Sequence, residues 1–167
     1  MKKKIEILAP AKDLIGGMAA INSGADAVYI GAPQFGARSN ANNSLEDVAA
    51  LVKYAHLFNA QVFVVMNTIL YDNELETCRQ MIYELYDIGV DALIIQDMAI
   101  MEMELPPIVL HASTQANNRD ADKIKFLKDA GIKRVVLARE LNLHQIKTIY
   151  DEADVELEFF VTGALCV

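Results

Sequence analysis

The sequence predicts an α/β protein with a parallel, (β/α)8 TIM-barrel-like sheet of about seven βα units. A short pattern recurs along the chain, as "GADAVYIGA" (24–32), "NAQVFVVMN" (59–67), "GVDALIIQD" (89–97) and "GIKRVVLAR" (131–139). Each copy starts with Gly or Asn, which tolerate the left-handed backbone that follows a helix. A short apolar run rich in Val and Ile comes next. Such runs are typical of parallel strands buried on both faces.

Helical spacing fills the intervals between these runs. The segment "SLEDVAALVKYAHLFN" (44–59) opens with a Ser44-x-x-Asp47 capping signal and places its apolar residues on one stripe. Segment 73–89 begins with Asn73 as its predicted N-cap, and two more helices are expected at 120–131 and 142–154. Further strands are expected at 4–11, 107–114 and 156–163. This alternation indicates a parallel sheet. An open doubly wound sheet is the alternative, but no G-x-G-x-x-G loop follows a strand.

The seven βα units suggest that residues 1–167 form a single barrel-like domain that is truncated at its C-terminal end. The seventh strand has no helix after it, and the sequence contains no eighth strand. An unclosed barrel leaves edges at strands one and seven, where unpaired backbone groups are a liability. We therefore expect these edges to be covered by a second copy of the chain in a homodimer, or by direct contact between the two strands.

Composition excludes several classes of protein. No apolar run approaches the roughly 20 residues that a membrane span needs, so no membrane partner is expected. The chain has two cysteines, too few for a disulfide framework, which favours a reducing cytoplasm. The net charge of −8 argues against nucleic-acid binding by this segment alone, because contacts to phosphates need clustered Lys and Arg.

Candidate functional residues follow from the strand ends, where barrel enzymes place their active sites. Counting eight residues on from the start of each repeat gives Ala32, Asn67, Asp97 and Arg139. The weaker strands add Pro10, Thr114 and Thr162. We interpret Asn67, Asp97 and Arg139 as catalytic candidates. Neighbouring polar residues at the strand ends are candidates for substrate binding, namely Gln96, His111, Ser113, Gln115 and Thr162.

Strand alternation also predicts carboxylates inside the barrel. Glu6 and Glu158 fall on the inward-facing positions of strands one and seven, and Glu6 is a further catalytic candidate. Because a lone buried charge is costly, we expect these carboxylates to be paired, with Arg139 as their inward partner. The alternative is that Glu156 and Glu158 lie on an exposed edge of an unclosed sheet, where charges limit aggregation.

A hydrolytic site can also be drawn from Ser113, His111 and Asp97. However, no G-x-S-x-G turn is present, and residues 111 and 113 on one strand rarely face each other. A hydrogen-bonded structural histidine is the favoured interpretation of His111. The sequence also contains no CxxC, H-E-x-x-H or P-loop motif.

Five segments resemble the collagenase-like peptidase family, a U-type family without an assigned mechanism. These are "EILAPA", "GADAVYIGAPQFGAR", "STQAN", "RVVLARELNLHQI" and "GALC", and they occur in the family's order across essentially all 167 residues. The resemblance implies a barrel-like N-terminal domain, in agreement with the strand count. Members of the family are labelled as proteases, while others are oxygen-independent hydroxylases acting on ribosomal RNA, transfer RNA or a quinone precursor.

The resemblance also implies a cofactor. In the hydroxylases four cysteines bind an iron–sulfur cluster, and the first lies in the "GALC" motif, which here contains Cys166. A single cysteine cannot hold a 4Fe–4S cluster, so none is expected in this chain by itself. Thr162 stands where family members commonly have histidine. We expect the full-length protein to be an iron–sulfur-dependent hydroxylase of RNA or a small molecule, with a true peptidase as the alternative, and this chain alone to be inactive.

Overall fold

The computed structural model describes residues 5–36 and 43–162, and in these ranges seven strands form one parallel sheet. The strand order is β1-β2-β3-β4-β5-β6-β7. The strands are β1 (Leu8–Ala11), β2 (Ala27–Gly31), β3 (Gln61–Met66), β4 (Ala92–Ile95), β5 (Val109–Ala112), β6 (Arg134–Val136) and β7 (Glu156–Glu158). The consecutive order confirms the barrel-like fold, because a doubly wound sheet reverses its order at a switch point.

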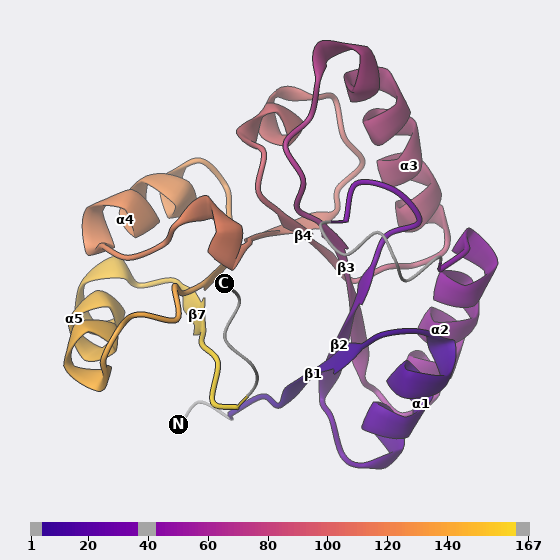
Figure 1. The fold of residues 1–167 in the computed structure, drawn as a ribbon, viewed down its shortest axis with the longest axis horizontal. Helices are drawn as coiled ribbons and strands as arrows, with labels where there is room; N and C mark the ends of the chain where they lie inside the picture. Colours follow the sequence, from indigo (N-terminus) through magenta and orange to yellow (C-terminus); the bar gives the residue numbers. More distant parts are fainter. Residues whose placement is uncertain (1–4, 37–42, 163–167) are drawn as a thin grey trace.

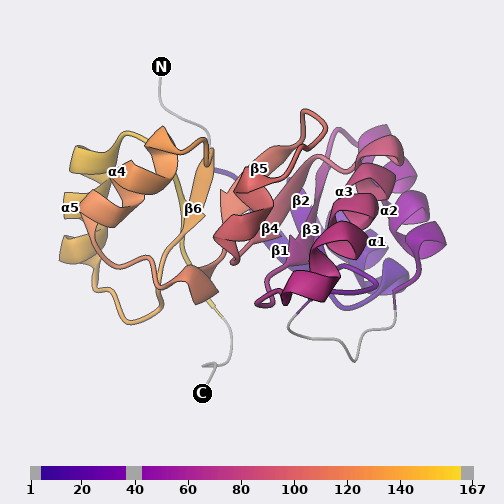
Figure 2. The ribbon, with the colours of Figure 1, turned by 90° about the horizontal axis from the view of Figure 1, so that it is seen from above.

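The helices lie on the outer face of the curled sheet, as Figures 1 and 2 show. They are α1 (Leu14–Asn22), α2 (Leu45–Leu57), α3 (Leu75–Asp87), α4 (Ala121–Asp129) and α5 (Leu143–Ala153). Short 3-10 turns follow three of the strands, namely η2 (Asp72–Glu74), η3 (Met98–Glu102) and η4 (Thr114–Ala116). No helix in the described ranges is long and apolar enough to cross a membrane.

The first residue of each repeat has the predicted left-handed backbone. Gly24, Gly89 and Gly131 have φ angles of 98°, 86° and 112°, and Asn59 has a φ of 55°. Each residue follows the end of a helix and leads the chain into the next strand. Each copy of the repeat therefore forms the same structure, a turn after a helix followed by a buried strand.

Helix capping follows the sequence at most of the predicted starts. The Ser44 hydroxyl accepts a hydrogen bond from the Asp47 backbone N–H at 3.1 Å, and the Asp47 carboxylate accepts one from the Ser44 N–H at 3.2 Å. This reciprocal pair is a capping box. The prediction for Asn73 is wrong, because Asn73 lies inside η2 and α3 begins only at Leu75. The Glu74 carboxylate instead accepts a hydrogen bond from the Tyr71 N–H at 2.8 Å.

Apolar side chains form two separate layers, as strand alternation requires. The larger layer lies between the sheet and its helices and includes Val28, Ile30, Val62 and Leu93. The smaller layer contains residues of opposite parity, on the inside of the curl, namely Ala27, Phe63, Ala92, Ile94 and Val136. Phe63 is the largest of these and is 1% exposed. The inside of the curl is therefore a packed core around which the polar residues of the site are arranged.

The sheet is open between β1 and β7 in the described ranges, because each pairs with one neighbouring strand only. Figure 1 shows β1 and β7 as the two edge strands of the curled sheet. The contact across this seam is an ion pair. Arg134 of β6 hydrogen-bonds Glu6, which precedes β1, and Glu156 of β7. Arg134 of β6 therefore bridges the two edge regions, while direct contact between strands β1 and β7 and the homodimer both stay predictions.

Candidate functional site

Polar side chains from β3 and β5 meet at the carboxyl edge of the sheet. Asn67, the first residue after β3, donates a hydrogen bond from Nδ2 to the Ser113 hydroxyl at 3.2 Å. Ser113 follows β5, is 2% exposed and also accepts from the Gln115 backbone N–H at 3.3 Å. Two of the predicted site residues are therefore in direct contact, across the strand that separates them in the sheet.

Asn118 links the ends of β5 and β6 and was not singled out from the sequence. Its side chain is fully buried, and Nδ2 donates to the backbone carbonyls of Ser113 at 2.9 Å and Val136 at 2.8 Å. The Asn118 Oδ1 atom has no hydrogen-bond partner in the part of the chain that the structure describes. Asn117 precedes it with a left-handed φ of 59°. The "NN" pair after "STQA" is the only sequence signal, since Asn favours such turns.

Asp97 ties two loops together at the same edge. One carboxylate oxygen accepts from the Ala99 backbone N–H at 2.9 Å, and the other accepts from the Leu70 N–H at 2.9 Å. Asp97 is thereby the N-cap of η3 and a clamp on the loop after β3. Both oxygens are occupied by backbone groups, so the geometry gives Asp97 a positioning role.

Replacing Asp97 with Asn is expected to lower the free energy of unfolding by about 1 kcal/mol, because the amide nitrogen cannot accept the second backbone hydrogen bond. Urea denaturation measures the change. Asp120→Asn is the matched control, since Asp120 caps α4 with a single oxygen and Asn is an equally good N-cap. Equal effects of the two substitutions would contradict the clamp.

Arg139 lies at the carboxyl end of β6, beside β7. Its guanidinium carbon is 4.2 Å from the centroid of the Phe160 ring, in the range of a cation–π contact. Arg139 is three residues past the end of β6 at Val136. This places Arg139 at the carboxyl edge of the sheet, with Asn67 and Ser113. Arg134, which pairs with Glu6, lies at the other end of β6.

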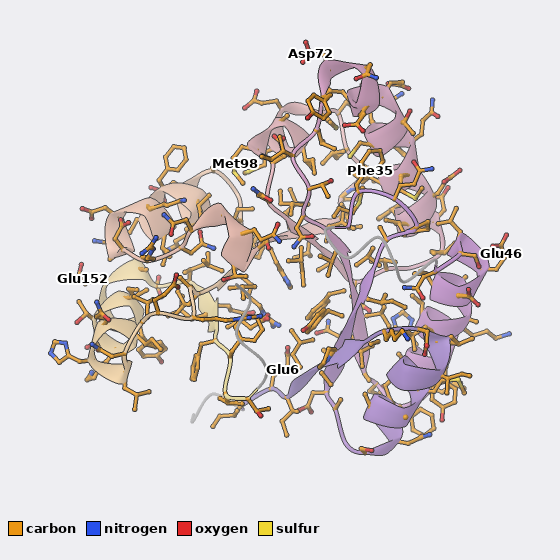
Figure 3. All side chains as sticks on the ribbon, in the orientation of Figure 1. Glu6, Phe35, Glu46, Asp72, Met98 and Glu152 are labelled. Carbon is orange, nitrogen blue, oxygen red and sulfur yellow. The ribbon has the colours of Figure 1, made fainter. Side chains whose placement is uncertain are left out.

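The predicted pairing of Glu6 with Arg139 is wrong, because Arg134 takes that place. Arg134 Nη1 and Nη2 donate to the two Glu6 carboxylate oxygens at 2.6 and 3.2 Å. Nε and Nη2 also donate to Glu156 at 3.1 and 3.0 Å. Arg134 opens β6, so its side chain lies at the amino edge of the sheet. Figure 3 labels Glu6, which precedes β1. The catalytic candidate Glu6 is thus at the opposite edge from Asn67 and Arg139.

Arg134, Phe63 and His111 form a stack inside the amino end of the curl. The guanidinium carbon of Arg134 lies 5.2 Å from the Phe63 ring centroid. The His111 ring meets Phe63 edge-on, with 4.8 Å between centroids. His111 is 4% exposed, and burial together with the charge of Arg134 lowers its pKa to about 3. His111 is therefore a neutral ring packed in the core.

The structure does not assemble the alternative Ser/His/Asp system. His111 Nδ1 has no hydrogen-bond partner among the described residues, whereas a triad requires this nitrogen to donate to the acid. The Asp97 carboxylate is bound to backbone N–H groups instead. The favoured interpretation of His111 as structural agrees with its burial, although its Nδ1 lacks the expected hydrogen bond.

Glu158 is the inward carboxylate that strand alternation predicts. Burial raises its pKa to about 7; the charge of Arg134 lowers it and that of Glu6 raises it. Among residues 5–36 and 43–162, its Oε2 atom has no hydrogen-bond partner. The alternative of an exposed sheet edge describes Glu156, whose side chain is 63% exposed, but not Glu158. Below about pH 7 Glu158 therefore holds its proton, which avoids the cost of a buried charge.

The remaining candidates differ in exposure. Gln96 is half-buried directly after β4, whereas Gln115 and Thr162 are exposed.

Cys166, the predicted metal ligand, lies outside the described residues. Within residues 5–36 and 43–162, no group of three or more His, Cys, Asp or Glu could hold a metal ion. Cys78, the free cysteine of these ranges, is buried in α3, and burial raises its pKa to about 11. The described residues therefore do not fit an iron–sulfur cluster, which needs several thiolates around one site.

The fold and site define a barrel-type α/β protein with its polar residues gathered at the carboxyl ends of parallel strands. Residues 12–167 match the model of peptidase family U32, and the chain belongs to this family. The family is the one that the sequence motifs resemble, so that prediction is confirmed.

Relatives and solved structures give further comparisons. The chain is 56% identical over 164 residues to the 23S rRNA 5-hydroxycytidine C2501 synthase of Escherichia coli, covering 98% of this chain and 25% of that protein. It is 35% identical over 169 residues to the tRNA hydroxylation protein P1 of Bacillus subtilis, covering 99% and 40%. The chain thus spans less than half the length of each of these two relatives. The U32 peptidase Mk0906 has the same fold, with a TM-score of 0.74 at 15% identity over 95% of this chain and 70% of that chain.

Proposed function

We propose that this chain is the barrel-like domain of an enzyme that hydroxylates RNA. The observation that carries the proposal is its 56% identity, across 98% of the chain, to a protein named as a 23S rRNA 5-hydroxycytidine synthase. A second RNA-hydroxylation protein matches over 99% of the chain. An enzyme of ribosomal or transfer RNA would work in the cytoplasm.

A true peptidase is the second candidate, because the family bears that name. The site offers it little support. His111 is buried and neutral, and Asp97 is bound to two backbone N–H groups. An activated nucleophile needs a base within hydrogen-bond reach and a third group that orients the base. The described residues do not provide this arrangement.

In the proposed enzyme the carboxyl edge of the sheet contacts the substrate. Asn67 and Arg139 are the proposed substrate contacts, with Ser113 and Gln96 beside them, while Asp97 holds the surrounding loops. Glu6 lies at the amino edge, so we assign it to the ion pair with Arg134. The net charge of −8 leaves the phosphate backbone of RNA to other parts of the full-length protein.

A 4Fe–4S cluster belongs to the proposal for the full-length protein only. Cys166 is the proposed ligand from this chain, and the other thiolates would come from outside these 167 residues. Such a cluster supplies electron-transfer chemistry when it is bound. The residues described here would bind and orient the substrate.

The proposal is tested by deleting the gene and analysing ribosomal and transfer RNA nucleosides by mass spectrometry. We expect one pyrimidine nucleoside to lose the mass of one oxygen atom, and the wild-type gene to restore it. Restoration by an Asn67→Ala variant should be at least about tenfold weaker if Asn67 contacts the substrate. Unchanged RNA in the deletion strain, together with peptide cleavage by the full-length protein, would favour the peptidase.

A further inference from the structure

Phe160 is an aromatic side chain held at the carboxyl edge of the sheet with part of its surface exposed. It follows β7 by two residues, and alternation from Glu158 places it on the inner side of the curl. Its exposed fraction is 37%. Ligands of barrel-type folds bind at this edge. Phe160 therefore offers an apolar surface at the position where a substrate would approach.

Arg139 gives this ring a fixed partner. The guanidinium carbon lies 4.2 Å from the ring centroid, which is close for a cation–π contact. Arg139 comes from the segment after β6 and Phe160 from the segment after β7, so the contact joins two neighbouring strand ends. A planar cation and an aromatic ring held together form a ready-made stacking surface.

The charge of the chain indicates which part of an RNA this surface would bind. A net charge of −8 disfavours contacts along the phosphate backbone. Sequence-specific RNA recognition instead uses unstacked bases, which stack on aromatic side chains and Arg guanidinium planes. An enzyme acting on a base must also take that base out of its helix. The Phe160 ring and the Arg139 guanidinium can both stack on an unpaired base.

We propose that Phe160, oriented by Arg139, is the stacking platform for the unpaired base that the enzyme modifies or for its immediate neighbour. The inference rests on the proposed function, because it takes RNA as the substrate. Hydrogen-bonding side chains follow β3 and β4 on the same edge, at Asn67 and Gln96. The base would stack on Phe160 and present its polar edge toward these groups.

Phe159 provides a matched control within the same segment. It is adjacent to Phe160, has the same side chain and is 45% exposed. Alternation places it on the opposite side of the strand, with Leu157, which packs against the helix-side core. Substitution of Phe159 therefore removes the same apolar surface without touching the platform.

The test uses the full-length protein and an unstructured pyrimidine oligoribonucleotide, with Kd measured by fluorescence anisotropy. Phe160→Leu is expected to raise Kd about tenfold, and Phe160→Trp to keep it near the wild-type value, because indole also stacks. Phe159→Leu should leave Kd unchanged. The salt dependence of binding should be the same in Phe160→Leu and wild type, since phenylalanine neutralises no phosphate.

The outcomes separate this inference from the proposed function. Equal Kd values for Phe160→Leu, Phe159→Leu and wild type, in a protein that hydroxylates RNA, would overturn the platform alone. A Phe160→Trp variant as weak as Phe160→Leu would also overturn it. If the wild-type protein neither binds nor hydroxylates RNA, the proposed function fails and the platform fails with it.

Discussion

Replacing Arg134 with methionine is expected to lower the free energy of unfolding by about 3 kcal/mol. The Arg134 side chain is 13% exposed and hydrogen-bonds both Glu6 and Glu156. Methionine keeps the packing against Phe63 but leaves those two carboxylates without the cation. The value is at the low end for a broken buried ion pair, because Glu6 and Glu156 are themselves 32% and 63% exposed.

Arg79→Met is the control for this substitution. Arg79 also makes a hydrogen bond of 2.6 Å to a glutamate, Glu76, but on the surface of α3 and within one turn of the helix. Exposed pairs of this kind contribute little, so the urea midpoint should hardly move. The measurement is equilibrium urea unfolding of both variants beside wild type. Equal shifts in midpoint would show that Arg134 does not stabilise the seam.

Much of the fold could be predicted because each repeat combines a backbone signal with a burial signal. The positive φ angles of Gly24 and Gly131 and the apolar runs after them are local properties of the chain. Helix α1 was harder to recognise. Its sequence, "LIGGMAAIN", contains two adjacent glycines, which disfavour a helix. Gly17 is needed there because a Cβ would lie 2.6 Å from Leu51.

The site was predictable only in part, because position along the chain and pairing between strands carry different information. Counting from the repeats located Asn67 and Arg139 at the carboxyl edge. The partner of Glu6 depends on the register of β6 with β7, where Arg134 lies opposite Glu156. Register is set by the whole sheet. Asn118 was missed for the same reason, since its hydrogen bonds go to carbonyls on two different strand ends.

Two buried groups inside the curl, Glu158 and His111, should change the free energy of unfolding with pH in opposite directions. Burial raises the pKa of Glu158 from 4.5 to about 7, so the folded protein holds a proton that the unfolded chain releases. This contribution to stability is fully present below about pH 4.5 and is lost as the pH rises toward 7. Burial and Arg134 lower the pKa of His111 from 6.5 to about 3. Its contribution is present above about pH 6.5 and is lost as the pH falls toward 3.

The two slopes overlap between about pH 4.5 and 6.5, where each changes the free energy of unfolding by at most about 1.4 kcal/mol per pH unit. In wild type they largely cancel. We expect Glu158→Gln to unmask the His111 slope, so that its stability rises by about 2 kcal/mol between about pH 5 and 6.5 relative to wild type. His111→Phe keeps a ring against Phe63. We expect the stability of this variant, relative to wild type, to fall by a similar amount over the same interval.

Urea unfolding of wild type, both single variants and the double variant at several pH values measures these slopes. Arg134 acts on both groups and Glu6 acts on Glu158. Both residues are present in all four proteins, so the comparison uses differences between proteins rather than absolute slopes. Between about pH 4.5 and 6.5 the double variant should return to the pH dependence of wild type, because both opposing contributions are gone. If Glu158→Gln instead has the wild-type slope, Glu158 is ionised in the folded protein, and the buried carboxylate must have found a partner for its charge.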